Sequence, residues 1–335
     1  MRRRSQFTVT FLFAGLLTPL CAQDRTPWRD PSPHTVKSVT TDEGVRLEVL
    51  DWGGSGRPLV LLAGGGNTAH VFDDFAPKLA ANFHIYGVTR RGFGASSFVA
   101  LEGGATRLGQ DVLAVIDALK LDRPVLVGHS FGGAELSAVA NFRPDRIAGL
   151  VYLEAGYTYA FDNGKGMKME ELMVLQARQP QPPAAGPSDL VSFGALQEWQ
   201  GRRDGYRIPE AELRQTWEST GNGRPEKPRF FLGFSVFTPV LTAATRYTGI
   251  PVPALAVFTI PHVPETWMTE SSDPAVRSAV EANQEFDALA DKQAKAFEAG
   301  VPTAHVVRLR GRHYVFMSNE REVLDEIRAF VAGLQ

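Results

Sequence analysis

The sequence has one cysteine, almost no excess of charge and no apolar run long enough to cross a bilayer. A single cysteine forms no intrachain disulfide, which excludes a disulfide-stabilised scaffold and a metal site built on several thiolates. Lys and Arg number 35 against 37 Asp and Glu, and this balance excludes a polybasic nucleic-acid binder. A hydrophobic content of 44% likewise excludes a disordered chain. The composition therefore indicates a globular protein whose stability comes from the packing of a core.

The first 22 residues have the pattern of a secretory signal peptide. Three arginines at positions 2 to 4 precede an apolar run from Phe7 to Leu17, and Ala22 is a small residue suited to cleavage. This run is shorter than the roughly 20 residues that span a bilayer. We therefore expect export to the periplasm or the extracellular space, without stable membrane insertion after cleavage. Leu20 fits such sites poorly, so the exact cut stays open, but cleavage after Ala22 would also remove Cys21.

Apolar runs rich in β-branched residues alternate with helical patterns along the rest of the chain. The expected strands are Val45–Trp52, Leu59–Ala63, His84–Thr89, Val125–Gly128 and Ile147–Leu153, and the expected helices are Leu108–Leu119 and Ala134–Asn141. Alternating strands and helices pair the strands in parallel through right-handed crossovers. The sequence therefore predicts an α/β fold with a mostly parallel central sheet flanked by helices.

The alternation is interrupted between residues 155 and 249, where two helical patterns flank a proline-rich stretch. The sheet pattern returns at Ala254–Ile260 and His305–Leu309, and Asn319–Leu334 is an amphipathic helix. We predict four segments: a signal peptide (1–22), a first part of the core (23–154), a helical insertion (155–249) and a second part of the core (250–335).

The residues that carry chemistry centre on one turn between a strand and a helix. Ser130 follows the strand at Val125–Gly128, and Gly128 and Gly132 flank it two residues away on either side. A nucleophile on so tight a turn needs small neighbours. The following helix directs its N-terminal N–H groups toward the seryl oxygen, which favours a developing oxyanion. The G-x-S-x-G spacing is common by chance, so its position between strand and helix is what indicates a nucleophile.

With these features in this order, the mature chain resembles the α/β-hydrolase superfamily. Glycines 64 to 66 and Asn67 follow a strand, where that superfamily places its oxyanion-hole loop, and residues 91–96 resemble its RGxGxS segment. The insertion lies where its lid domain is usual, and Gly311, Arg312 and His313 follow the last strand. The resemblance therefore implies an α/β-hydrolase fold with a helical lid between two core strands.

The resemblance also implies a role for particular residues. The nucleophile of the superfamily corresponds to Ser130, and its general base corresponds to His313. The oxyanion would be bound by the backbone N–H of Phe131 and by that of Gly65 or Gly66.

The carboxylate that orients the histidine departs from the commonest pattern of the superfamily. Most members place it after the strand that follows the lid, but Pro261 and His262 occupy that position here. A subset that includes haloalkane dehalogenases takes it from the end of the strand before the lid, where this chain has Glu154. Such a position faces the crevice in which ligands bind. We favour Glu154 and keep Asp273 as the alternative acid, followed by Glu265 and Glu270.

Two further residues lie near the expected site. His262 stands beside it, and we favour a structural role over a catalytic one. Glu135, five residues after Ser130, is expected to be a solvated helix residue rather than an acid supporting the site.

The nucleophile indicates the reaction class. Haloalkane dehalogenases and epoxide hydrolases of this superfamily attack with aspartate, whereas a serine activated by histidine performs acyl transfer. We predict a secreted or periplasmic carboxylic-ester hydrolase that acts on a small-molecule ester, with no metal, organic cofactor or nucleic acid implied. The same residues would support lactone, amide or carbon–carbon bond hydrolysis or perhydrolysis, and a catalytically silent ligand-binding homologue is the non-enzymatic alternative. The sequence predicts no oligomeric state.

Large apolar side chains of the insertion would either roof an apolar pocket or pack the insertion onto the core. They are Phe161, Met167, Met169, Trp199, Trp217, Phe230, Phe231, Phe234 and Phe237.

Overall fold

The computed structural model describes residues 28–41, 44–229, 233–241 and 246–334. The predicted signal peptide lies outside these residues. The chain from Ser32 onward forms one compact unit, and all that follows concerns this unit.

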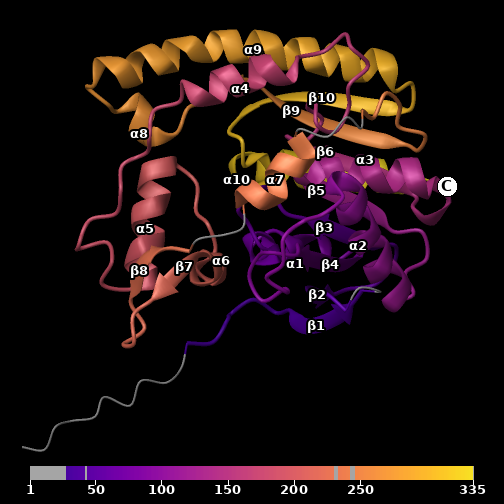
Figure 1. Cartoon of the computed structure of the whole chain (residues 1–335), viewed down its shortest axis with the longest axis horizontal. Coiled ribbons are helices and arrows are strands. Elements are labelled where there is room, and N and C mark those ends of the chain that lie inside the picture. Colours follow the sequence, from indigo (N-terminus) through magenta and orange to yellow (C-terminus); the bar gives the residue numbers. More distant parts are fainter. Residues whose placement is uncertain (1–27, 42–43, 230–232, 242–245, 335) are drawn as a thin grey trace, which may run out of the picture. The chain divides into compact units, whose positions relative to one another are not determined.

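The unit is built on an eight-stranded sheet in the order β1-β2-β4-β3-β5-β6-β9-β10 (Figure 1). The first three strands of this order pair antiparallel, and the remaining pairs are parallel. The fold class predicted from the sequence, a mostly parallel sheet flanked by helices, is confirmed. The strands are β1 (Thr35–Thr40), β2 (Arg46–Gly53), β3 (Pro58–Leu62), β4 (His84–Thr89), β5 (Val125–His129), β6 (Gly149–Leu153), β9 (Ala254–His262) and β10 (Ala304–Gly311).

The central strands are apolar throughout because helices cover both faces of the sheet. In β3, Val60 and Leu62 pack into one core cluster with α2 and α3, whereas Leu59 and Leu61 pack into a second cluster with η1, α1 and α11. This division follows from the alternation of side chains along a strand. The helices are η1 (Ala69–Phe72), α1 (Ala76–Leu79), α2 (Gly104–Ala118), α3 (Gly132–Phe142), η2 (Pro144–Arg146), α8 (Thr266–Thr269), α9 (Pro274–Gly300), α10 (Val315–Ser318) and α11 (Glu320–Ala332).

The helix α9 runs along the β9–β10 side of the sheet (Figure 1), and the sequence analysis did not predict it. Its buried face is weakly apolar because small or polar side chains form much of it, among them Ala290, Ala294 and Gln293, next to the large buried ring of Phe297. A face of this kind gives little hydrophobic periodicity to detect.

Between β6 and β9 the chain forms α4 (Met169–Ala177), α5 (Phe193–Asp204), α6 (Glu210–Thr216), the antiparallel pair β7 (Trp217–Ser219) and β8 (Pro225–Pro228), and α7 (Gly233–Leu241). Phe193, Leu196 and Leu213 make a small core of their own in this segment, with Trp199 and Trp217 packed against it. Among the helices that the structure describes, none combines the length and the apolar character needed to span a membrane.

Candidate active site

Ser130 occupies the turn between β5 and α3 in a left-handed backbone conformation, with φ of 49°. The two glycines that flank it are required by close packing. A Cβ on Gly128 would lie 2.9 Å from the Gly132 carbonyl carbon, and a Cβ on Gly132 would lie 2.7 Å from the Leu62 carbonyl oxygen. A larger residue at either position would displace backbone, so the spacing read from the sequence has a steric cause.

His313 follows β10 and contacts the seryl oxygen. Its Nε2 lies 2.9 Å from Ser130 Oγ, within the range of a hydrogen bond. The imidazole is 44% exposed, so one side of the ring remains open. His129, next to Ser130 in the chain, hydrogen-bonds the His313 carbonyl oxygen through Nε2 at 3.0 Å. Burial, together with the nearby His313, lowers the pKa of His129 to about 3, so this ring is neutral.

Glu154 lies directly after β6, with its side chain 0% exposed. Its Oε2 is 3.4 Å from His313 Nδ1. The Thr259 N–H donates to Oε1 at 2.5 Å, and the Tyr157 hydroxyl donates to both oxygens, at 3.2 and 3.0 Å. Burial alone would raise the pKa of the Glu154 carboxyl, but His262 and His313 outweigh it and lower this pKa below its usual range. The carboxylate is therefore ionised, and it faces the imidazole that contacts Ser130.

His262 is the second imidazole on this carboxylate. Its Nε2 lies 3.2 Å from Glu154 Oε2, and its Nδ1 lies 3.0 Å from Asp287 Oδ1 on α9. Burial would lower the pKa of His262, but Glu154 and Asp287 together raise it to about 9. His262 is thus an imidazolium held between two carboxylates. Sequence reasoning singled out His262 but missed Asp287, which also accepts the backbone N–H of His262 at 2.9 Å and lies 25 residues further along the chain.

The alternative acids lie elsewhere. Asp273 is exposed and caps α9, where its carboxylate accepts the Ala275 N–H at 2.8 Å. Glu270 is exposed beside α8, and Glu265 faces the cavity described below. Within the described residues, none of the three is hydrogen-bonded to His313, so Glu154 is the carboxylate that the fold brings to this histidine.

The residues predicted to bind the oxyanion lie around Ser130. Gly65, Phe131 and Ser130 line the same cavity, and Phe131 precedes the first turn of α3. Gly66 adopts φ of 80° in a turn that the Asn67 N–H closes onto the Gly64 carbonyl oxygen at 3.4 Å. A Cβ on Gly65 would come within 3.0 Å of the Phe237 ring, so the loop also fits closely against the segment between β6 and β9.

A buried carboxylate from α6 fastens this loop. Glu212 accepts hydrogen bonds from Asn67 Nδ2 at 3.0 Å and from the Thr68 N–H at 3.1 Å, and also from the Thr68 hydroxyl. The Tyr314 hydroxyl donates to the other end of the Asn67 amide at 2.9 Å. Burial raises the pKa of Glu212 to about 7, although its hydrogen bonds act in the opposite direction. This carboxyl was absent from the sequence predictions because it lies 145 residues from Asn67.

The beginning of the glycine loop, directly after β3, is held by a buried ion pair. Arg90 donates to the Ala63 and Gly64 carbonyl oxygens at 2.7 and 3.3 Å, and its Nε donates to Glu135 at 2.6 Å. Glu135 is 3% exposed, so the expectation of a solvated helix residue is wrong. The reason is Arg90, whose guanidinium compensates the buried carboxylate and uses its remaining donors on the loop.

A cavity of about 490 Å³ opens above Ser130 and His313. Of the apolar side chains expected to roof a pocket, Met169 and Phe237 line this cavity. The other described ones pack instead: Phe161 and Met167 in the sheet core, and Trp199 and Trp217 against α5 and α6. The side chains of Phe230, Phe231 and Phe234 lie outside the described residues. The remaining lining is mostly apolar and includes Tyr157, Tyr159, Leu172, Met173, Leu175, Met268 and Phe286.

This fold and this serine turn define the class of protein. Residues 59–326 match the alpha/beta hydrolase family, and the chain belongs to that family. The resemblance seen in the sequence is thereby confirmed at the level of the superfamily.

Several known proteins are similar to the chain. It is 27% identical to a pyrethroid hydrolase from Sphingobium wenxiniae, over 72% of this chain and 94% of that protein. Two further curated relatives, 36% and 34% identical, are matched over only 29% and 38% of their own length. The solved structure of E-2-(acetamidomethylene)succinate hydrolase superposes with a TM-score of 0.60 at 19% identity, covering 90% of this chain and 100% of that one. Carboxylesterase CesB from Bacillus subtilis gives 0.54 at 16% identity, covering 90% and 93%.

Proposed function

We propose that the chain is a serine carboxylic-ester hydrolase, with Ser130 as nucleophile, His313 as general base and Glu154 as the carboxylate that orients it. The observation that carries this proposal is the 2.9 Å contact between Ser130 Oγ and His313 Nε2 at the floor of the cavity. The ionised Glu154 behind the imidazole fits the third position of such a triad. Relatives that hydrolyse esters, such as the carboxylesterase, share the fold.

The reaction follows from these positions. Ser130 Oγ attacks the ester carbonyl carbon while its proton passes to His313 Nε2, and Glu154 stabilises the imidazolium that forms. The carbonyl oxygen becomes an oxyanion and accepts the N–H of Phe131 and that of Gly65 or Gly66. The intermediate collapses when His313 returns the proton to the leaving alcohol, which leaves an acyl-enzyme. Water then attacks the acyl carbon and gives one proton to His313. The second intermediate collapses as His313 passes this proton to Ser130 Oγ, which releases the acid and restores free Ser130.

The cavity supports an ester with apolar substituents on the side away from the serine. Its walls carry Leu172, Met173 and Phe286, and the described lining residues include no lysine or arginine. Apolar burial would supply most of the binding free energy. The same triad would act on lactones, amides, carbon–carbon bonds or, with peroxide, perhydrolysis, and these reactions are the alternatives to ester hydrolysis.

The test is labelling by an organophosphonate probe, followed by a series of p-nitrophenyl esters of increasing acyl length. We expect one label per chain on Ser130, a burst of nitrophenol and turnover. Ser130→Ala should lose both, whereas Ser38→Ala, an exposed serine of β1, should keep both. A chain that takes no label and gives no burst would instead support the silent binding protein. Labelling with turnover of amides or lactones only would move the assignment to those reactions.

We further propose that residues 1–22 direct export of the chain. The basis is the arginine-led apolar run and the small residue at its end. Expression of the full chain in a Gram-negative host, followed by fractionation and mass determination of the periplasmic form, would show a mature N-terminus near Gln23. A full-length chain retained in the cytoplasm would contradict this proposal.

A further inference from the structure

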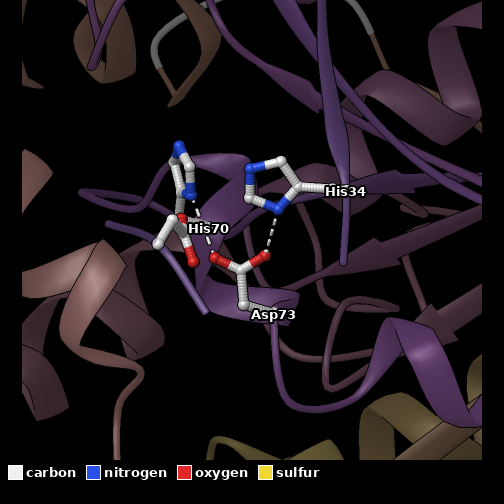
Figure 2. Close-up of side chains that lie close together, drawn as sticks. His34, His70 and Asp73 are labelled. Atoms are coloured by element: carbon white, nitrogen blue, oxygen red, sulfur yellow. Dashed lines mark hydrogen bonds and ion pairs between the residues drawn. The ribbon is translucent and has the colours of Figure 1, made fainter. Parts of the chain in front are cut away.

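A second group of imidazoles and carboxylates lies away from Ser130. His34 precedes β1, His70 lies in η1, and Asp73 directly follows η1. Both rings point toward the Asp73 carboxylate (Figure 2), with His34 Nδ1 2.9 Å from Oδ1 and His70 Nδ1 2.9 Å from Oδ2. The three side chains are only 4%, 6% and 3% exposed. The reaction proposed above uses none of them.

The spacing of these atoms suits a metal ion. The potential ligand atoms of the group lie within 4.8 Å of one another. In tetrahedral zinc sites the bonds to nitrogen and oxygen are about 2.0–2.2 Å, so neighbouring ligand atoms lie about 3.3 Å apart. Ring nitrogens at 2.9 Å from a carboxylate therefore need to separate by only a few tenths of an ångström. Two imidazoles and one carboxylate also form a ligand set that Zn²⁺ accepts.

The surroundings of the group resemble the outer contacts of metal sites. Metal-bound histidines usually donate their other ring N–H to a carboxylate, which fixes the ring. Here Glu48 Oε1 lies 3.7 Å from His70 Nε2, and the Thr89 hydroxyl holds the other Glu48 oxygen at 2.7 Å. The indole Nε1–H of Trp52 donates to Asp73 Oδ1 at 3.2 Å. These contacts orient the Asp73 carboxylate and place the Glu48 carboxylate next to the free edge of the His70 ring.

The charges are also appropriate for a divalent cation. The carboxyl groups of Asp73 and Glu48 are both buried, and each accepts a hydrogen bond from a neighbouring group, from the Trp52 indole at Asp73 and from the Thr89 hydroxyl at Glu48. As carboxylates they carry one negative charge each. Histidines bind metals as neutral imidazoles, so the loaded group would carry two negative charges, which a divalent ion balances.

We propose that His34, His70 and Asp73 bind one divalent metal ion of the zinc type, which fastens the segment before β1 to η1. The site is structural, because it shares no residue with the Ser130–His313 contact. It joins His34 to residues that lie 36 and 39 positions later in the chain. These residues lie in and directly after η1, the helix that follows the loop of Gly65 and Gly66. Metal loading would therefore raise the stability of the fold around that loop.

The test is Zn²⁺ binding to the full chain after treatment with a chelator, followed by calorimetry, elemental analysis and thermal unfolding. We expect uptake of one Zn²⁺ per chain that raises the melting temperature. Asp73→Asn should weaken this binding by at least about 100-fold because it removes the anionic ligand. Glu48→Gln, which removes only the outer partner, should weaken it by about 10- to 100-fold.

The matched control is His84→Gln. His84 Nε2 also lies 2.9 Å from a carboxylate, that of Asp51, and among the described residues no second imidazole contacts this carboxylate. This variant should bind Zn²⁺ like the parent chain. Zn²⁺ bound at His313 instead of at the His34, His70 and Asp73 group would inhibit ester hydrolysis, and it would still bind to the Asp73→Asn variant. These two readouts distinguish the two binding sites.

Two results would overturn the proposal. One is a chelator-treated parent chain that takes up no stabilising Zn²⁺ at micromolar concentration. The other is a folded Asp73→Asn or His34→Gln variant with unchanged affinity. Where Asp73→Asn fails to fold, His34→Gln decides, since His34 lies outside the helices and strands. Co²⁺ added to the parent chain gives a further readout, because a tetrahedral site produces strong visible absorption that His34→Gln should reduce.

Discussion

In the part of the chain that the structure describes, Glu154 and Asp73 are buried carboxylates that each contact two imidazoles. Glu154 contacts His313 and His262, at 3.4 and 3.2 Å, and Asp73 contacts His34 and His70, both at 2.9 Å. The groups are chemically alike but differ in exposure. His313 is 44% exposed and reaches Ser130, whereas both rings on Asp73 are almost completely buried.

The difference in exposure of the imidazoles determines which chemistry each group can perform. Proton transfer to a substrate needs an imidazole that can reach solvent or a cavity, and only the Glu154 group offers one. An enclosed pair of rings on one carboxylate can instead hold an ion or tie two segments together. Residue type alone therefore does not distinguish an active site from a structural cluster.

The largest effect is expected from removing the nucleophile. Ser130→Ala should lower kcat for ester hydrolysis by about 10⁴- to 10⁶-fold, because no other group supplies the acyl-enzyme. Thermal unfolding should show little change. His34→Gln, from the other cluster, should leave kcat within about threefold, and a comparable loss there would erase the distinction between the two groups.

The next largest effect separates the two candidates for the carboxylate that orients His313, Glu154 and Asp273. Glu154→Gln should lower kcat by about 10³- to 10⁴-fold with the fold retained, because the imidazolium loses its stabilising charge. Asp273→Asn, at the exposed cap of α9, should stay near the parent rate. The reverse ranking in steady-state kinetics would assign the acid to Asp273.

A third prediction concerns the carboxyl that fastens the loop after β3. The pKa of Glu212 is raised from its ordinary 4.5 to about 7, so the folded state holds a proton that the unfolded state releases. Stability should therefore fall as pH rises from 4.5 to 7, by about 3 kcal/mol. The groups around it are Asn67, Thr68 and, at longer range, His70. In Glu212→Gln this slope should disappear, which urea unfolding at several pH values would measure; an unchanged slope would show that Glu212 is ionised throughout.

The smallest effect is expected at His262. Its replacement by Gln removes one of several hydrogen bonds to Glu154, worth about 1.5 kcal/mol, so kcat should change by about tenfold or less. Because its pKa is raised from 6.5 to about 9, its ion pairs with Glu154 and Asp287 stabilise the fold below pH 6.5, and this contribution is lost as pH rises through 9. The variant should lack this loss in thermal unfolding curves. A drop in kcat as large as that of Glu154→Gln would make His262 part of the proton-transfer machinery.

Much of the fold could be predicted because it depends on local patterns. The apolar runs of β3, β5 and β6 and the turn at Ser130 are each encoded within a few residues, and Glu154 and His313 follow strand ends. Contacts between distant segments could not be predicted. Glu212 meets Asn67 across 145 positions, and His34 meets Asp73 across 39. Nothing in the neighbourhood of either residue indicates its partner, because the packing of whole elements brings the two together.

The position of Glu154 directly after β6 has a consequence for the segment that follows the neighbouring strand. Val263, Pro264 and Glu265, which follow β9, line the cavity but take no part in the Glu154–His313–Ser130 chain of contacts. Substitutions in this tripeptide can reshape the wall of the cavity while these three side-chain contacts stay intact. The segment is thus suited to mutational diversification, in nature or in a directed-evolution library, as a means of changing which molecules enter the cavity.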